Sequence, residues 1–361
     1  MNHNDYELKV SAPGRICLFG EHQDYFDLPI IAAAINLRIT ISGKRKRNPG
    51  IAIDMPDIGE KENLSLGKEL KYSKARDYLK SAVNILQREG LIPDSGWDCK
   101  ISGTIPINSG TASSSALVVA WTKFLLEAVQ DRRAGLQDGI ANMAFMAEVA
   151  EFKEPGGKMD HYSSALGGVI SIHFENQLQV KQLPNNLGSF VLADSLQRKN
   201  TTGTLGFIKC HVLNGVKKIQ REREEFQLNT SPLEEYMENI ERLDKEERNL
   251  LKGTMLTRDL TAEGETLFES GAFDHARFGA LLSRQQNVLQ NYLKISTPKI
   301  DQMLDAALQA GALGGKGNGS GGGGCVFAYS PDRAEEVADA LRRLDTKPFI
   351  IHVGEGVRIE S

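Results

Sequence analysis

The sequence predicts an α+β protein with two domains. At 361 residues the chain is long enough to bury two hydrophobic cores. Strand-like and helix-like segments alternate along its first half, which favours a mixed fold. Beyond residue 193 the composition changes to long polar helices, and a β-α-β pattern over residues 325–353 completes a compact second domain.

Hydrophobic periodicity predicts the individual elements. The helix expected at residues 113–130 opens with three serines and is apolar nearly all round, as a buried helix is. A second helix, at residues 136–153, ends before a Pro-Gly-Gly turn, and the mixed charges of residues 217–252 predict a solvated helical face. The last helix is expected to begin with Ser330 as its cap. Strands are predicted at residues 8–10, 30–40, 97–107, 169–172, 190–193, 325–329 and 349–353.

Composition and charge argue against several classes of function. A formal charge of −4 offers no positive field for nucleic acid. The N-terminus lacks the regions of a signal peptide, and no stretch reaches the ~20 apolar residues of a membrane span, so we expect a cytoplasmic protein without membrane contact. The four cysteines form no Cys-x-x-Cys pair, which predicts reduced residues of the core or a cavity wall.

The most informative segment is residues 11–25, which places Arg15, Glu21, His22 and Asp24 between two apolar runs. Carboxylates and a guanidinium make charge-assisted hydrogen bonds, and a sugar offers them many hydroxyls. The segment therefore predicts a site for a polyhydroxylated ligand. The alternative is an ordinary polar turn after a strand.

A second motif, at residues 104–116, joins a strand to a helix start rich in hydroxyls. The first turn of a helix exposes N–H groups that can hold phosphate, and a serine there can ligate Mg²⁺. The alternative is an N-cap, for which one serine suffices, whereas residues 113–115 are all serine. Because the chain has no Walker pattern, any nucleotide is expected to be held by different machinery.

A glycine cluster occupies residues 311–325 and includes Gly-x-Gly-x-x-Gly. It follows a helical pattern and leads into a strand, the reverse of a dinucleotide-binding fingerprint. A tight loop that closely approaches a ligand or another backbone is predicted, in preference to a flexible linker.

Two carboxylates lie between these motifs. Glu148 falls on the apolar stripe of its helix and is expected to point inward. Asp160 follows the Pro-Gly-Gly turn and could bind a metal or accept a proton. Otherwise each would be a helix cap or a surface charge.

Together these motifs resemble the GHMP kinases, the family of galactokinase, homoserine kinase, mevalonate kinase and phosphomevalonate kinase. Residues 13–25 look like the galactokinase sugar signature, usually Gly-Glu-His-Thr-Asp-Tyr. Residues 106–116 look like the phosphate loop, one residue longer than usual, and residues 314–324 look like the third motif, which closes over it. Residues 147–148 and 155–160 align with galactokinase's Ala-Glu-His and Pro-Cys-Gly-Ile-Met-Asp.

The resemblance implies a two-domain GHMP kinase fold with the active site between the domains. The N-terminal domain, expected at residues 1–187, would be ribosomal protein S5 domain 2-like, with an unusual left-handed β-α-β unit. The C-terminal domain, expected at residues 188–361, would be ferredoxin-like.

The resemblance also implies which residues perform catalysis and hold metal. Asp160 would be the general base or orienting carboxylate beside the acceptor hydroxyl. Arg15 would keep Asp160 ionised and offset charge on the transferred phosphoryl group. Ser115 and Glu148 would hold Mg²⁺.

The remaining roles implied by the resemblance concern binding. Glu21, His22 and Asp24, together with Asp160, would bind the substrate. The ATP phosphates would be bound by the amides of the phosphate loop, which are those of Gly110, Thr111, Ala112, Ser113, Ser114 and Ser115.

The acceptor implied by the resemblance is the anomeric hydroxyl of galactose or a related aldose. Two departures from galactokinase leave other acceptors open: only Phe26 and Asp27 separate Tyr25 from the following Leu-Pro, and residues 193–203 replace a Val-Arg-His…Ser-Glu-Tyr segment. Lys158 could suit an acidic substrate group. The alternatives are a kinase for another aldose, a uronic acid or mevalonate, and a non-catalytic sensor of sugar and ATP. A monomer or homodimer is expected.

Overall fold

The computed structural model describes residues 8–107, 109–174, 177–197 and 201–361. Asn108 of the predicted phosphate loop and residues 198–200 of the segment that departs from galactokinase lie outside this range.

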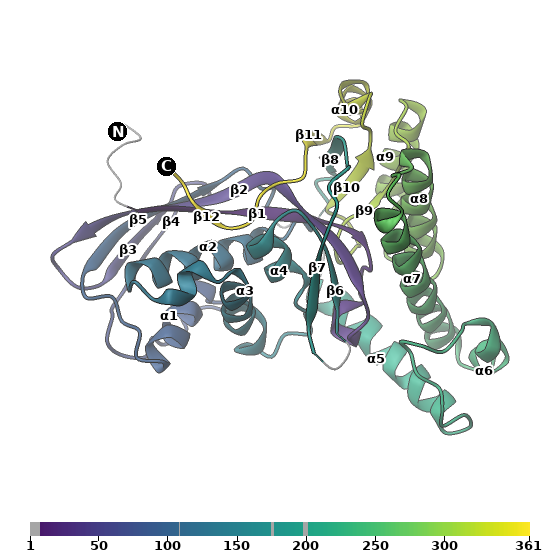
Figure 1. Ribbon diagram of the computed structural model, residues 1–361, viewed down its shortest axis with the longest axis horizontal. Coiled ribbons are helices and arrows are strands. Elements are labelled where there is room, and N and C mark those ends of the chain that lie inside the picture. Colours follow the sequence, from purple (N-terminus) through teal and green to yellow (C-terminus); the bar gives the residue numbers. More distant parts are fainter. Residues whose placement is uncertain (1–7, 108, 175–176, 198–200) are drawn as a thin grey trace.

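The framework consists of two β-sheets covered by helices (Figure 1). The larger sheet runs in the order β12-β1-β2-β5-β3-β4, with β6 beside β2 and β7 beside β6. Its strands are β1 (Leu8–Phe19), β2 (Ile30–Lys46), β3 (Ile51–Met55), β4 (Glu60–Leu64), β5 (Gly96–Gly103), β6 (Val169–His173), β7 (Gln179–Leu183) and β12 (Arg358–Ile359).

Helices cover one face of the larger sheet (Figure 1). Helices α2 (Ser113–Ala128) and α4 (Met159–Leu166) pack directly on β1 and β2. Helices α1 (Tyr78–Arg88) and α3 (Gln137–Phe145) pack against α2. The sheet and its neighbours surround α2 so completely that all of its apolar residues except the partly buried Leu117 are buried, which confirms the prediction of a buried helix.

The smaller sheet is antiparallel and runs in the order β11-β8-β10-β9, which is the strand order of ferredoxin-like sheets. Its strands are β8 (Phe190–Asp194), β9 (Gly314–Gly317), β10 (Cys325–Tyr329) and β11 (Lys347–Ile351). Its half of the molecule also contains α5 (Thr201–Gln220), α6 (Met237–Glu241), α7 (Lys245–Glu269), α8 (His275–Asn291), α9 (Pro298–Gln309) and α10 (Ala334–Arg342). The chain then returns to the larger sheet, where β12 pairs with β1.

Strand β1 joins the two halves because it is buried on both faces. Cys17 and its neighbours on one face belong to the core under α2, whereas Ile16 and Phe19 belong to a second core with α7, α8 and the smaller sheet. The ring of Phe19 meets that of Phe278 on α8 edge-on, with centroids 5.9 Å apart. The residues that line the space between the domains are therefore held by packing from both sides.

Several elements differ from the sequence expectations. The first strand was expected to end at residue 10, but β1 continues to Phe19 because its side chains find apolar partners on both faces. The helix expected at residues 136–153 is α3 followed by a π-helical segment, Met146–Ala150. Ser330 does not cap the last helix, since its N–H bonds to the carbonyl of Ser189 and keeps the chain extended until α10 begins at Ala334. Part of the glycine cluster is the strand β9 rather than a loop.

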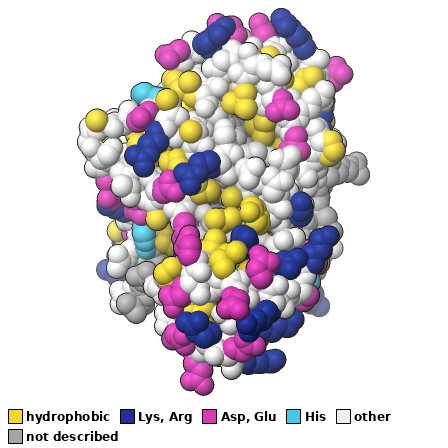
Figure 2. Space-filling model, turned by 90° about the vertical axis from the view of Figure 1, so that its right-hand side faces the viewer, with side chains coloured by type: hydrophobic (Ala, Val, Ile, Leu, Met, Phe, Trp, Pro, Cys, Tyr) yellow, Lys and Arg dark blue, Asp and Glu magenta, His cyan; other side chains and the backbone are white. Residues whose placement is uncertain are grey.

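The surface of the helical half bears charges of both signs. On the face shown in Figure 2, which is the right-hand side of Figure 1, Lys and Arg are interspersed with Asp and Glu. The segment at residues 217–252 is not one helical face, since α5 ends at Gln220 and α7 begins at Lys245. Cys17, Cys99 and Cys325 are buried as expected, but Cys210 is exposed on α5. In the described part of the chain, no helix has the length and apolar character needed to cross a membrane.

The shared core predicts a large cost for removing Phe278. This ring is fully buried against Phe19, Phe190 and Tyr329, so Phe278→Ala should lower the free energy of unfolding by about 3–5 kcal/mol. Phe207→Ala is the control, because that ring is 50% exposed on α5 and its loss should change stability by about 0.5 kcal/mol or less. Denaturant unfolding measures both, and equal losses would contradict this account of the core.

Candidate active site

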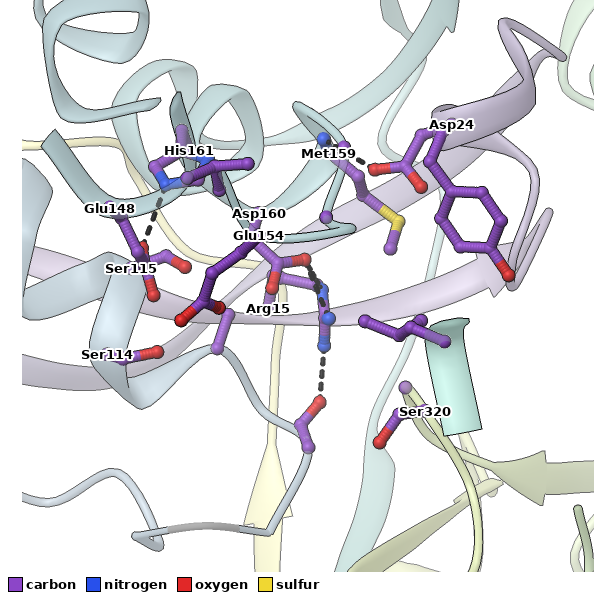
Figure 3. Close-up of a pocket in the computed structure, with 18 of the residues that line it drawn as sticks. Arg15, Asp24, Ser114, Ser115, Glu148, Glu154, Met159, Asp160, His161 and Ser320 are labelled. Atoms are coloured by element: carbon purple, nitrogen blue, oxygen red, sulfur yellow. Dashed lines mark hydrogen bonds and ion pairs between the residues drawn. The ribbon is translucent and has the colours of Figure 1, made fainter. Parts of the chain in front are cut away.

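The predicted site residues meet at one cavity. A cavity that is open to solvent is lined by β1, the turn after it, the start of α2, the start of α4 and the loop after β9. Every predicted site residue except Thr111 lines this cavity, and Thr111 is buried beside it. Figure 3 shows the labelled side chains around the cavity.

Arg15 extends from β1 and makes a contact network at the centre of the cavity. Its Nε donates to Oδ1 of Asp160 at 2.8 Å, its Nη2 lies 2.7 Å from the same oxygen, and its Nη1 donates to the carbonyl of Gly110 (Figure 3). The Arg15 N–H also donates to the Thr111 carbonyl at 3.1 Å. This approach requires a glycine at position 14, because a Cβ there would lie 2.7 Å from the Thr111 oxygen.

Among the described residues of the phosphate loop, no side chain makes a capping hydrogen bond at the start of α2. Ala112 is the N-cap residue of α2 and has a left-handed φ of 56°, a conformation that an alanine rarely adopts. None of the three following serines caps the helix, which removes the simple N-cap as an explanation for them. The first-turn N–H groups therefore remain available to an anion at the cavity wall.

Glu148 is buried as predicted, in the π-helical segment that follows α3. Burial alone would raise the pKa of this carboxyl, but a hydrogen bond with His161 and contacts with Ser114 and Ser115 outweigh burial and lower the pKa. The Nε2 of His161 lies 2.8 Å from Oε2 of Glu148 (Figure 3). An ionised carboxylate beside two hydroxyls suits Mg²⁺, which takes a few hard oxygen ligands from the protein and the rest from phosphates and water.

Asp24 lies near the opposite end of the cavity from Glu148, at the start of the short helix Asp24–Phe26 (Figure 3). Its Oδ2 accepts a hydrogen bond from the Met159 N–H at 3.1 Å. Gly157 permits this position, since a Cβ there would lie 2.1 Å from the same carboxylate oxygen. Burial and the negative charge of Asp160 raise the pKa of Asp24 to about 6.

Glu21 and His22 complete this end of the cavity. Both side chains are buried, and Nδ1 of His22 lies 2.7 Å from the Tyr25 hydroxyl. Oε1 of Glu21 forms an ion pair with Lys316, and Oε2 of Glu21 has no partner among the described residues. One buried carboxylate oxygen therefore stays available at the cavity wall.

The glycine-rich strand of the second domain lies against the site, and the loop after it forms part of the cavity wall. Lys316 on β9 is fully buried and reaches Glu21, and its Nζ also donates to the Cys17 carbonyl at 2.9 Å. Asn318 accepts from the Cys17 N–H and donates to the Gly110 carbonyl, each at 2.9 Å. The Cys325 N–H at the end of the glycine cluster donates to the Ser109 carbonyl at 2.6 Å, which confirms the prediction that the cluster closely approaches another backbone.

Comparison with known proteins agrees with this geometry. Residues 77–168 match the GHMP kinases N terminal domain, residues 267–345 match the GHMP kinases C terminal, and residues 2–45 match the galactokinase galactose-binding signature. A mevalonate kinase from Thermococcus gammatolerans is 31% identical, with 98% of each chain covered. A galactokinase from Mannheimia succiniciproducens is 26% identical, covering 92% of this chain and 87% of the relative.

The chain belongs to the GHMP kinase family. Its members are phosphotransferases with alcohol acceptors, and they use ATP as the phosphate donor. The fold of this GHMP kinase matches Lactococcus lactis galactokinase complexed with galactose, with a TM-score of 0.85 over 97% of this chain and 94% of that one at 21% identity. Methanococcus jannaschii mevalonate kinase also matches, with a TM-score of 0.74 over 98% of this chain and 100% of that one at 19% identity. The predicted two-domain GHMP kinase fold is confirmed, whereas its domain boundaries stay a prediction.

The structure adds residues that sequence reasoning missed in this GHMP kinase. His161, Arg76, Tyr78 and Glu154 also line the cavity. His161 directly follows Asp160, so its position was a usable signal, but Arg76 and Tyr78 come from a segment with no motif. The ammonium of Lys158 lies over the ring of Phe145, 5.4 Å from the centroid, and Lys158 is not among the residues that line the cavity, so a contact of Lys158 with an acidic substrate group stays a prediction.

The raised pKa of Asp24 makes this carboxylate a cost to stability above pH 6. A folded-state pKa of about 6 against 3.8 means that the folded protein binds the proton more tightly, so stability falls as pH rises from about 4 to about 6. Asp24→Asn should therefore raise the melting temperature at pH 8 and leave it nearly unchanged at pH 3.5, with a gain of at most roughly 3 kcal/mol.

Scanning calorimetry across this pH range measures the difference between the two proteins. Asp305→Asn on α9 is the control, because that carboxylate is exposed and should show no such pH-dependent gain. A difference between wild type and Asp24→Asn that does not vary with pH would contradict the assignment.

Proposed function

We propose that this GHMP kinase transfers the γ-phosphoryl group of ATP to a neutral monosaccharide, at the anomeric hydroxyl of galactose or a related aldose. The observation that carries the proposal is the pair of carboxylates at the acceptor end of the cavity. Glu21 offers a buried oxygen that has no partner among the described residues, and the Asp24 carboxylate, which the backbone N–H groups of Met159 and Tyr25 hold, also lines the cavity. A buried acceptor without a donor is costly, and a substrate hydroxyl would satisfy it.

Charge argues for a neutral acceptor over an anionic one. Among the described residues that line the cavity, the lysine and arginine side chains are Arg15 and Arg76, and each is paired with a carboxylate. An acceptor with its own carboxylate, such as mevalonate or a uronic acid, would meet Glu21 and Asp24 at the end of the cavity where the nearby guanidinium, that of Arg15, is already bonded to Asp160. The galactose-binding signature matched at residues 2–45 supports the same choice.

Mevalonate is the second candidate acceptor. Mevalonate kinases from Thermococcus and Pyrococcus support this candidate, since they are 30–31% identical over 98% of the chain. A third candidate, a sensor without turnover, is disfavoured because Ser115, Glu148 and Asp160 all face the cavity.

In the proposed mechanism, Oδ2 of Asp160 accepts the proton of the acceptor hydroxyl while Oδ1 stays bonded to Arg15. The acceptor oxygen forms a bond to the γ-phosphorus as the bond to the β-γ bridging oxygen breaks, and ADP leaves. Arg15 offsets the charge that builds on the transferred group. The amides of residues 110–115 orient the phosphates, and Ser115 and Glu148 would hold Mg²⁺, which when bound supplies positive charge to the phosphate oxygens.

A panel of acceptors tests the substrate class. ADP formation should be stimulated by galactose or a related free aldose, and deoxy sugars that lack a hydroxyl bound by Glu21 or Asp24 should be poor substrates. Asp24→Ala should raise the KM for the sugar at least about tenfold and leave the KM for ATP within about twofold. Stimulation by mevalonate and by no monosaccharide would overturn the proposal in favour of the second candidate.

Asp160→Asn tests the proton acceptor. It should lower kcat by at least ~10²-fold, the usual scale for losing a general base, and leave ATP affinity nearly intact. Asp138→Asn, in the first turn of α3 and outside the cavity lining, is the matched control. Near-normal turnover of Asp160→Asn would refute the role of this carboxylate.

A further inference from the structure

The cavity contains an arginine for which the proposed mechanism has no task. Arg76 lies directly before the N-cap of α1 and lines the cavity together with Tyr78 and the serines of the phosphate loop. Its backbone φ is 60°, in the left-handed region that arginine rarely occupies. Strained backbone of this kind persists only where the surroundings hold it, and it is frequent at ligand sites.

The surroundings of Arg76 do hold its backbone. The buried carboxylate of Asp77 accepts from the Ser73 N–H at 2.9 Å and pairs with Lys80 at 2.9 Å. The Tyr78 N–H donates to the Arg76 carbonyl at 2.8 Å. The turn before α1 is therefore fixed independently of the Arg76 side chain.

Glu154 holds the Arg76 side chain in a two-pronged contact. Nε and Nη2 of Arg76 donate to the two carboxylate oxygens of Glu154 at 2.6 and 2.8 Å. This geometry fixes the plane of the guanidinium and leaves Nη1 without a partner among the described residues. Glu154 is placed by the wide turn after Met146–Ala150, where its N–H donates to the Val149 carbonyl at 3.0 Å.

Electrostatic neighbours place Arg76 at the phosphate-loop end of the cavity. The positive charge of Arg76 interacts with Glu148, which also contacts Ser114 and Ser115. Asp24, at the other end of the cavity, interacts instead with the charges of Arg15 and Asp160. All three nitrogens of the Arg15 guanidinium are already engaged by Asp160 and Gly110. Since the described lining contains no lysine, Arg76 has the free charged donor at this end.

We propose that Arg76 binds the triphosphate of ATP through Nη1 and that Glu154 is the positioning residue that aims it. The proposal rests on ATP being the donor of the proposed function, but it does not depend on which alcohol is the acceptor. Arginine suits this task because its planar fork can hold a carboxylate on one edge and present a donor to a phosphate oxygen on another.

Binding to the full-length protein tests the role of Arg76 without turnover. Calorimetry would compare a non-hydrolysable ATP analogue with Mg²⁺ against adenosine, which lacks the phosphates. Arg76→Met should weaken analogue binding about tenfold and leave adenosine binding within about twofold. Arg76→Lys, which keeps the charge without the fork, should give an intermediate loss.

The control is Arg284→Met, which removes a comparable two-pronged arginine–glutamate pair on the surface between α8 and α7. It should leave both affinities unchanged. A merely structural role predicts instead that Arg76→Met lowers the melting temperature without changing analogue affinity, and that result would overturn the proposal. A wild-type protein that binds neither ligand would overturn both this proposal and the use of ATP.

A double-mutant comparison tests the positioning role of Glu154. Glu154→Gln should weaken analogue binding about threefold by releasing the guanidinium, and it should have no further effect in the Arg76→Met background. If Glu154→Gln weakens analogue binding equally in the wild type and in Arg76→Met, or in neither, the positioning role of Glu154 is refuted. If sugars fail to stimulate ADP formation but the analogue affinities change as expected, the proposed acceptor is wrong. The role of Arg76 in binding the triphosphate would then still hold.

Discussion

The buried ion pair between Lys316 and Glu21 is the contact on which the site depends. Lys316 comes from the glycine strand β9 of the second domain, and Glu21 comes from the turn after β1 of the first. Neither side chain reaches solvent, and burial lowers the pKa of Lys316. Removing one member would leave a buried charge uncompensated, which is far more costly than losing a surface pair. The pair therefore fixes both the docking of the domains and the carboxylate that faces the acceptor.

The same contact explains why the cavity favours hydroxyls over anions. Lys316 engages one oxygen of Glu21 and leaves the other for a ligand, so the cation that could have attracted a substrate carboxylate is already used inside the protein. Asp24 adds a second acceptor whose ionisation is made difficult by burial and by Asp160. Burying such groups without partners costs free energy of folding, because a carboxylate has a lower free energy in water or beside a partner. Stability of the fold alone would therefore not keep these groups together. Their joint presence is expected of a binding site.

The residues that the sequence singled out lie together at one cavity, and they were recognisable because they occur in three motifs of unusual composition. Glycines and serines at a helix start and acidic residues after a strand are local signals, and they identified Arg15, Glu148 and Asp160 as neighbours through resemblance. Contacts between distant segments left no such signal. Neither the pairing of Lys316 with Glu21 nor that of Arg76 with Glu154 follows from local sequence, since each depends on how two elements far apart in the chain pack. The full extent of β1 was missed for the same reason, since its second face is covered by α7 and α8.

The identity of the phosphorylated product tests the central claim most directly. The purified protein would be incubated with ATP, Mg²⁺ and an equimolar mixture of galactose and mevalonate, and phosphorus–proton correlation spectroscopy would identify the atom that carries the new phosphate. A cavity whose acceptor end is built from Glu21 and Asp24 predicts a sugar phosphate in which phosphorus couples to the anomeric proton. A product in which phosphorus couples only to the methylene protons of mevalonate would contradict the account.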